Sequence, residues 1–252
     1  MRPRTGASGA LVGPQGEQLV RDIRELDIGT GFLVTGQSAD LADSKDSIFS
    51  RVPLALTIVA AATFVLLFLM TGSLLIPLQA LVLNVLSLGA VFGAMVWIFQ
   101  DGNLSGLLDF TSTGTIDTAI PMLVFCTAFG LSMDYEVFLI SRIKEEYDAN
   151  GGENTAAVAN GLQCTGRIMT AAAGVLSITF IAFALTSHVN TIKLFGLAMT
   201  LAILLDATLV RGLLVPSFLR LGGDANWWAP APLRRVHQRF GLSESEPRAD
   251  NE

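Results

Sequence analysis

Five blocks of about 20 mainly apolar residues dominate this chain of 252 residues. Blocks of this length match a membrane, because a helix rising about 1.5 Å per residue needs about 20 residues to cross a hydrocarbon core of about 30 Å. The blocks cover residues 52–71, 76–99, 119–141, 168–186 and 192–219. They predict five transmembrane helices, the last of which is long enough to tilt or to emerge from the bilayer.

The composition agrees with a membrane protein. Hydrophobic residues make up 51% of the chain and charged residues 15%, and the mean hydropathy is +0.55, whereas soluble chains are about a quarter charged. The net charge of -6 comes mainly from the chain ends and loops, and no basic stripe predicts a nucleic-acid partner. Cys126 and Cys164 have neither disulfide nor metal spacing, and no phosphate-binding loop is present. We therefore expect the bilayer as a partner, no nucleic acid, no metal and no cofactor.

The connections predict how the helices follow one another. Residues 72–75 leave room only for a tight turn between the first two spans, and Pro77 and Pro121 suit the first turns of the second and third helices. The polar segment 145–167 is expected to contain a short surface helix at 155–164.

The basic residues near the predicted membrane ends divide unevenly between the two sides. One side has seven and the other three: Arg142, Lys144, Arg167, Arg220, Arg234, Arg235 and Arg239, against Lys45, Arg51 and Lys193. By the positive-inside rule, the carboxy terminus is cytoplasmic. Five spans then place the amino terminus outside a multi-pass protein of the cell membrane.

Three regions are expected along the chain. They are the end of an extracytoplasmic domain (1–50), a five-helix transmembrane domain (51–220) and a cytoplasmic tail (221–252). In the first region we predict a helix over 16–26, a strand over 31–35 and a helix over 38–51. The fold class is therefore an all-α polytopic membrane protein of five transmembrane helices, preceded by a small α/β extracytoplasmic remnant.

Four ionisable residues fall within the apolar spans: Asp134, Glu136, Asp206 and Arg211. A charge in lipid costs about 2.5 to 3.5 kcal/mol or more, so each of them requires a reason. Glu136 points about 200° away from Asp134 on a helix, and we expect it to form a structural ion pair with Arg142 or Lys144. Asp206 and Arg211 are about 140° apart around an ideal helix, so each is expected to find another partner, or Arg211 to reach the cytoplasmic surface.

Small and polar residues surround Asp134 along one face of its helix. They recur at offsets of three, four and seven: Thr127, Gly130, Asp134, Phe138 and Ser141. The fourth span has a similar stripe of Thr170, Gly174 and Ser177. We expect the two stripes to face each other, with Asp134 either loading and releasing protons or simply making an interhelical hydrogen bond. Asp206 and Arg211 have either a structural or a coupling role.

Two sequence runs resemble a known family. Residues 129–142, Phe-Gly-Leu-Ser-Met-Asp-Tyr-Glu-Val-Phe-Leu-Ile-Ser-Arg, resemble the Asp-Tyr helix of MMPL (mycobacterial membrane protein large) transporters of the RND superfamily. Residues 204–216, Leu-Leu-Asp-Ala-Thr-Leu-Val-Arg-Gly-Leu-Leu-Val-Pro, resemble their last helix, and residues 226–233 resemble the start of their cytoplasmic tail. The resemblance extends over about 31–242.

The resemblance implies a function. In such transporters, proton flow through Asp-Tyr pairs in the membrane drives export of lipids or other hydrophobic compounds, and each half has one span, a porter domain and five more spans. The pair implied here is Asp134 and Tyr135, supported by the polar residues Thr170, Ser177, Asp206 and Arg211. The chain matches only the carboxy-terminal membrane half, so we expect it to be incomplete alone and to need a partner chain or a homo-oligomer.

Two other functions stay open. The chain can be a non-transporting membrane assembly or lipid-binding subunit. It can also be an intramembrane aspartyl protease with Asp134 and Asp206 sharing a proton, but Asp206 lacks the Gly-x-Gly-Asp motif that such enzymes share. We therefore expect no enzymatic activity.

Overall fold

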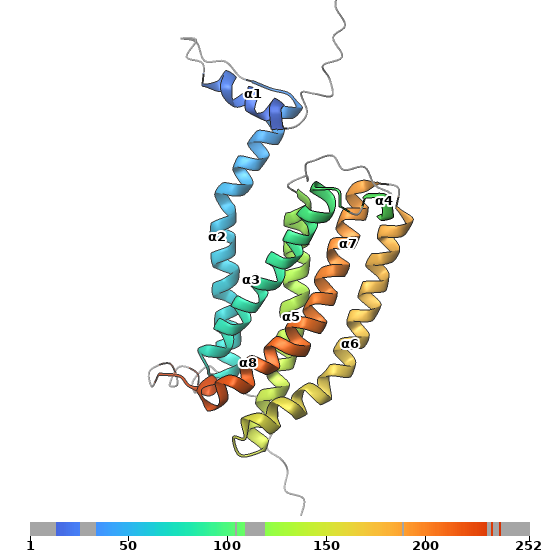
Figure 1. Ribbon diagram of the computed structural model, residues 1–252. Helices are drawn as coiled ribbons and strands as arrows, with labels where there is room; N and C mark the ends of the chain where they lie inside the picture. The colour runs from blue at the N-terminus through green and yellow to red at the C-terminus, as the bar shows by residue number, and fades with distance from the viewer. Residues whose placement is uncertain are drawn as a thin grey trace, which may run out of the picture. The chain divides into compact units, whose positions relative to one another are not determined.

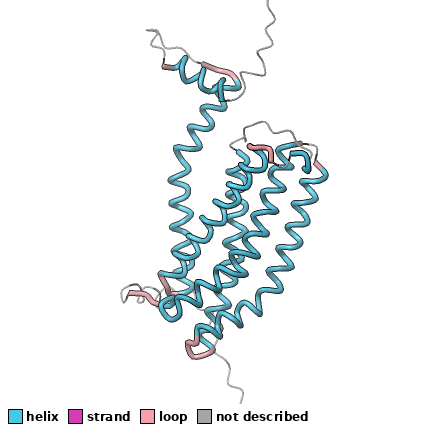
Figure 2. The backbone as a smooth tube through the Cα atoms, viewed as in Figure 1, coloured by secondary structure: helices cyan, strands magenta, loops and turns pink. Residues whose placement is uncertain are grey.

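The computed structural model describes residues 14–25, 34–103, 105–108, 119–187, 189–230, 233 and 237. The chain divides into two compact units, Met1–Val59 and Ala60–Glu252, and helix α2 (Gln37–Thr71) runs from the first into the second. The described regular elements are all helices, as the tube in Figure 2 shows.

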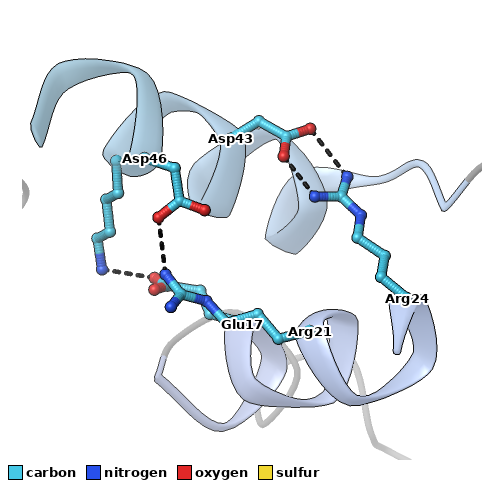
Figure 3. Close-up of polar contacts among 6 residues, drawn as sticks. Glu17, Arg21, Arg24, Asp43 and Asp46 are labelled. Carbon is cyan, nitrogen blue, oxygen red and sulfur yellow. Dashed lines mark hydrogen bonds and ion pairs between the residues drawn. The ribbon is translucent and has the colours of Figure 1, made fainter. Parts of the chain in front are cut away.

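In the first unit, α1 (Pro14–Arg24) packs beside the beginning of α2. Three ion pairs join the two helices (Figure 3): Arg21 with Asp46 at 2.9 Å, Lys45 with Glu17 at 2.6 Å, and Arg24 with both carboxylate oxygens of Asp43 at 2.5 and 2.9 Å. The helices predicted at 16–26 and 38–51 are therefore present.

The predicted α/β character of this region is not supported. Residues 31–33 of the predicted strand lie outside the described residues, while Val34 and Thr35 are described and are not in a strand. The regular elements described in this region are the helices α1 and α2, which side-chain ion pairs hold together.

Five helical stretches among the described residues are long and apolar enough to cross a membrane. The first four are α2, α3 (Leu75–Met95) with the π-turn η1 (Val96–Gln100), α5 (Ala119–Ala149) and α6 (Asn154–Thr186). The fifth stretch consists of four consecutive elements: α7 (Asn190–Leu205), the π-helix η2 (Asp206–Leu214), α8 (Val215–Gly222) and the 3-10 turn η3 (Gly223–Trp227). A short helix, α4 (Ser105–Leu108), lies in the loop after α3. The prediction of five spans is confirmed.

The second unit is a helical bundle (Figure 1) in which α6 packs against α5 and α7, and α3 contacts α5 and α7. Two glycines permit close helix contact: a Cβ at Gly161 would lie 2.6 Å from Ile143 Cγ1, and one at Gly196 would lie 2.7 Å from the Phe180 carbonyl oxygen. Large apolar side chains such as Val85, Ile178 and Leu185 are exposed on the outside. Exposed apolar surface on long apolar helices is what a lipid environment requires, and the protein is a multi-pass membrane protein.

The short surface helix predicted at 155–164 is instead the first part of α6. The turn before α6 contains Gly151 and Gly152, whose φ angles of 67° and 92° suit glycine and end α5. No Gly-Gly or proline interrupts the chain between Asn154 and Thr186, so one helix of 33 residues forms.

A neutral polar network, here called the Asn226 clasp, fixes the end of the bundle beyond α8. It consists of Ser73, Gln79, Asn154, Asn226 and Trp227. The Asn226 side chain is fully buried; it donates to the Leu219 carbonyl at 2.5 Å and accepts from Gln79 at 3.1 Å, while its backbone oxygen accepts from Ser73. Asn154 also donates to the Leu219 carbonyl, at 2.8 Å, and accepts from Trp227 Nε1 at 3.0 Å. Both donors thus bond to the Leu219 carbonyl, which lies in the last turn of α8. Carbonyls in the last turn of a helix lack a donor within the helix.

Trp227 also packs against α5. Its ring stacks on Tyr147 at 4.2 Å between centroids, and the Lys144 ammonium lies 5.3 Å from the Trp227 centroid. Trp228 is 60% exposed.

Candidate proton-relay site in the membrane

Helix α5 presents two carboxylates on opposite faces. Glu136 is buried together with Ser132, one turn before it, whereas Asp134 is exposed on the other face. The angle of about 200° between positions 134 and 136 is as predicted from helix geometry. Asp134, predicted to be the buried carboxylate, is thus the outward one in this chain, and Glu136 is the inward one.

Asp206 and Arg211 form a buried ion pair with each other. The prediction that they are poorly placed to pair is wrong, because it assumed an ideal α-helix. The two residues lie in η2, where hydrogen bonds run from residue i to residue i+5, so residue 211 comes to lie over residue 206. Pro216 follows this segment and cannot donate a backbone hydrogen bond, a feature that favours a local change of helix geometry.

Ser132 joins the ion pair to α5. Its hydroxyl donates to Asp206 at 2.8 Å, and its backbone carbonyl accepts from Arg211 Nη2 at 2.9 Å. The Arg211 guanidinium also lies 4.8 Å from the centroid of the Tyr135 ring, a cation–π contact. Arg211 Nε is buried and has no hydrogen-bond partner among the described residues.

Glu136 is hydrogen-bonded to α3. Asn84, itself buried, donates to Glu136 Oε2 at 2.9 Å. The expected ion pair of Glu136 with Arg142 or Lys144 does not form. Both cations pair locally on α5 at 2.5 Å, Arg142 with Glu145 and Lys144 with Asp148, because side chains three and four residues apart on a helix are neighbours.

The stripe on α6 does not face Asp134 as predicted. Thr170 is exposed and donates to the Gly166 carbonyl of its own helix at 2.7 Å, while Ser177 is buried and its hydroxyl has no partner among the described residues. Helices α5 and α6 do pack together, but they do so through a different pair of faces. Ala128 and Leu131 of α5 lie in one apolar cluster with Ala173 and Leu176 of α6.

The polar residues from three elements form what we call the charged cluster: Asn84 of α3, Ser132 and Glu136 of α5, and Asp206 and Arg211 of η2. Two hollows border it. One is lined by Tyr135, Asp206 and Arg211 together with apolar residues of α5, α6 and α7. The other is lined by Glu136 and Gln79 together with apolar residues of α3, α5 and α8.

Asn84, Ser132 and Glu136 are the cluster members whose role was not predicted from the sequence. A usable signal was present: Ser132, Glu136, Leu139 and Ile143 recur at helical spacing and form the buried face of α5. Asn84, an amide in the middle of an apolar span, was the matching signal on α3. Among the described residues, no group of three His, Cys, Asp or Glu side chains is placed to hold a metal ion.

Comparison with known proteins identifies the family. A family model described as the MMPL family matches residues 15–246. A membrane protein of Streptomyces coelicolor is 44% identical over 239 residues, which is 95% of this chain and 34% of that protein. The trehalose monomycolate exporter MmpL3 of Mycobacterium tuberculosis is 41% identical over 216 residues, 86% of this chain and 23% of the exporter.

A third relative, membrane protein YdfJ of Bacillus subtilis, is 33% identical over 258 aligned positions, 99% of this chain and 35% of YdfJ. The chain thus spans about a third or less of the length of these relatives. The family match covers most of the chain and includes every helix of the bundle, and this chain belongs to the MMPL family.

Proposed function

We propose that this chain is the carboxy-terminal membrane half of a proton-coupled MMPL transporter that exports lipid or other hydrophobic compounds. Membership of the family supports a membrane transporter, and one relative is named as an exporter of trehalose monomycolate. The observation that carries the proposal is the position of Asp134: an ionisable side chain halfway along a transmembrane helix, on a face that this chain leaves exposed.

A carboxylate facing lipid costs about 2.5 kcal/mol or more, so side chains of this type face protein or a water-filled path. The exposed face of α5 is therefore an interface with the rest of the transporter. Gly130 and Asp134 lie on this face one turn apart, and both are exposed in the described part of the chain. Small residues at such a face permit close approach of a second helix. Asp134 then binds and releases protons at the interface, and the Tyr135 hydroxyl donates to its ionised form.

The remaining residues have supporting roles in this proposal. Asp206 and Arg211 hold α5 to η2 through Ser132 and Tyr135, so they fix the rotation of α5 and the direction of Asp134. Thr170 and Ser177 supply hydroxyls on α6. The transporter is completed either by a chain that supplies the other membrane half or by a second copy of this chain.

We also propose an orientation. The ends of α5, α6 and α8 nearest the Asn226 clasp carry Arg142, Lys144, Arg167 and Arg220, and this excess of cations places them in the cytoplasm. Residues 1–50 then form the end of an extracytoplasmic domain, 51–220 the transmembrane domain and 221–252 a cytoplasmic tail. A Gly151→Cys variant, with Cys126 and Cys164 replaced by serine, reacts with an impermeant maleimide only in inverted vesicles if this orientation is correct.

The function is tested with Asp134→Asn in vesicles that contain this chain together with the protein that completes the transporter. The expected result is loss of proton-driven export with normal expression and assembly, because Asn has the size of Asp but carries no transferable proton. Ile178→Leu, an exposed apolar position on α6, serves as the control and keeps normal export. Normal export by Asp134→Asn would instead favour the assembly subunit.

The protease alternative requires Asp134 and Asp206 to share a proton. Asp206 faces Ser132, which points about 200° away from Asp134 around α5, and its carboxylate is already paired with Arg211. This arrangement favours a non-enzymatic transporter.

A further inference from the structure

The charged cluster contains an odd number of ionisable groups. Glu136, Asp206 and Arg211 are the acidic and basic residues that are buried among the described residues, and their exposed fractions are 3%, 8% and 5%. With all three ionised, the cluster has a net charge of minus one. An uncompensated buried charge is strongly unfavourable, and a buried acid escapes the penalty by binding a proton.

The hydrogen bonds indicate which of the two carboxyl groups holds that proton. Asp206 is paired directly with the Arg211 guanidinium and also accepts from the Ser132 hydroxyl, so both of its partners favour the ionised form. Glu136 has one neutral donor, Asn84 at Oε2. No described residue donates a hydrogen bond to its other oxygen, and a carboxylic acid places its O–H there.

The surroundings of Glu136 on every packed side agree with this assignment. From η2, the charges of Asp206 and Arg211 act on it in opposite directions. Helix α3 presents the neutral amides of Asn84 and Gln79, and α8 presents Val215 and Leu219. Among the described residues, the cation that acts on Glu136 is Arg211, and its charge is already matched by the Asp206 carboxylate.

We propose that Glu136 is a second proton-binding site of this transporter half, distinct from Asp134, and that it exchanges its proton with the end of the bundle that holds the Asn226 clasp. The hollow beside Glu136 runs along the first turns of α3, past Gln79 to Ile76. The hollow beside Asp206 instead reaches back along α5 to Leu131 and Ala128. The cluster thus lies between two hollows that extend in opposite directions along α5, and Glu136 borders only one of them.

The proposal deepens the proposed function and rests on it for its role in transport, but the charge state of Glu136 can be measured without transport. The experiment is infrared spectroscopy of the purified chain in lipid vesicles at neutral pH. An Asp134→Asn background removes any signal from the outward carboxyl. We expect a carboxylic-acid C=O stretching band, and we expect Glu136→Gln to abolish it. Absence of the band, or its persistence in Glu136→Gln, would overturn the proposal.

Two further variants test the charge balance itself. In Asp206→Asn, Arg211 loses its partner and Glu136 is expected to ionise in its place, so the band disappears although Glu136 is intact. In Arg211→Gln, both carboxyl groups are left without a cation, and the band is expected to grow about twofold. An unchanged band in both variants would show that the cluster does not set the proton on Glu136.

The route is tested by the rate at which the band shifts after transfer to heavy water. Ala80→Val narrows the hollow beside Glu136, and Ala128→Val narrows the other one. We expect Ala80→Val to slow the shift about tenfold or more and Ala128→Val to leave it unchanged. The reverse order would overturn the route. Loss of export in Asp134→Asn with the Glu136 band intact supports both proposals, whereas normal export in that variant with the same band rejects only the transport function.

Discussion

The second unit of the chain contains two buried polar networks of opposite character, the charged cluster halfway along α5 and the Asn226 clasp beyond α8. In the clasp, neutral donors and acceptors are matched: Asn226 and Asn154 share the Leu219 carbonyl, and Gln79, Ser73 and Trp227 donate to the two asparagines. In the charged cluster there are two carboxyl groups and one guanidinium, which pairs with Asp206, and Arg211 Nε has no partner among the described residues.

This difference separates a fixed structure from one with several states. A network of matched neutral groups has one low-energy arrangement, and its bonds rigidify the helix ends that they join. A cluster with one more acid than base has at least two protonation states of similar geometry. Proton carriers require that property, which supports the proposal that protons bind in the middle of the bundle.

The largest expected effect comes from Arg211→Gln. Removal of the cation leaves two buried acids without a counter-charge, and such a change costs about 3 to 5 kcal/mol. The free energy of unfolding, measured by denaturant titration in detergent micelles, should fall by that amount. A loss below about 1 kcal/mol would mean that the cluster is hydrated and that its charges are not buried.

A substitution in the Asn226 clasp should lower the free energy of unfolding by less, and the loss should not depend on pH. Asn226→Ala removes a side chain that bonds to Leu219 and Gln79, and each unsatisfied buried group costs about 1 to 3 kcal/mol. Because neither lost partner titrates, the loss of stability should be constant from mildly acidic to mildly alkaline pH. A loss that changes with pH would show that the clasp is coupled to a titrating group and would remove the distinction between the two networks.

The sequence predicted the spans and turns of the bundle but not which way its buried polar residues face. The five spans follow from length and apolarity, and the turn at 72–75 and the helix starts near Pro77 and Pro121 follow from local chemistry. The prediction that Asp134 faces α6 was wrong. A stripe of small and polar residues indicates only that this helix face contacts protein. It does not distinguish a neighbour within this chain from another part of the transporter.

The Asp206–Arg211 pair was missed for a different reason. The prediction applied the angle of an ideal α-helix, and a π-helix changes that angle over nine residues. A pair of opposite charges five residues apart in an apolar span, followed closely by Pro216, was the available signal. Glu136 was assigned to nearby cations in the sequence, although those cations lie on the part of α5 where local acids already pair with them.

A smaller effect is expected from Trp227→Phe in the clasp. The substitution keeps an aromatic ring to stack on Tyr147 but removes the donor to Asn154, a loss of about 0.5 to 1.5 kcal/mol. Trp228→Phe is the matched control: its side chain is 60% exposed, and its substitution should leave the free energy of unfolding unchanged. Equal losses for the two variants would indicate that Trp227 contributes only apolar area.

The smallest effect is expected from Glu136→Gln. A glutamine has the shape of a protonated glutamate, and its amide oxygen can still accept the hydrogen bond from Asn84. If Glu136 already holds a proton, the substitution should therefore cost almost no stability. The free energy of unfolding should change by less than about 0.5 kcal/mol, within the range of a neutral substitution. If Glu136 were ionised, the cluster would carry an uncompensated negative charge, and the same substitution would remove that charge and raise the free energy of unfolding by about 1 kcal/mol or more. The two variants measured side by side therefore decide whether the charged cluster is an ion triad or an ion pair beside a stored proton.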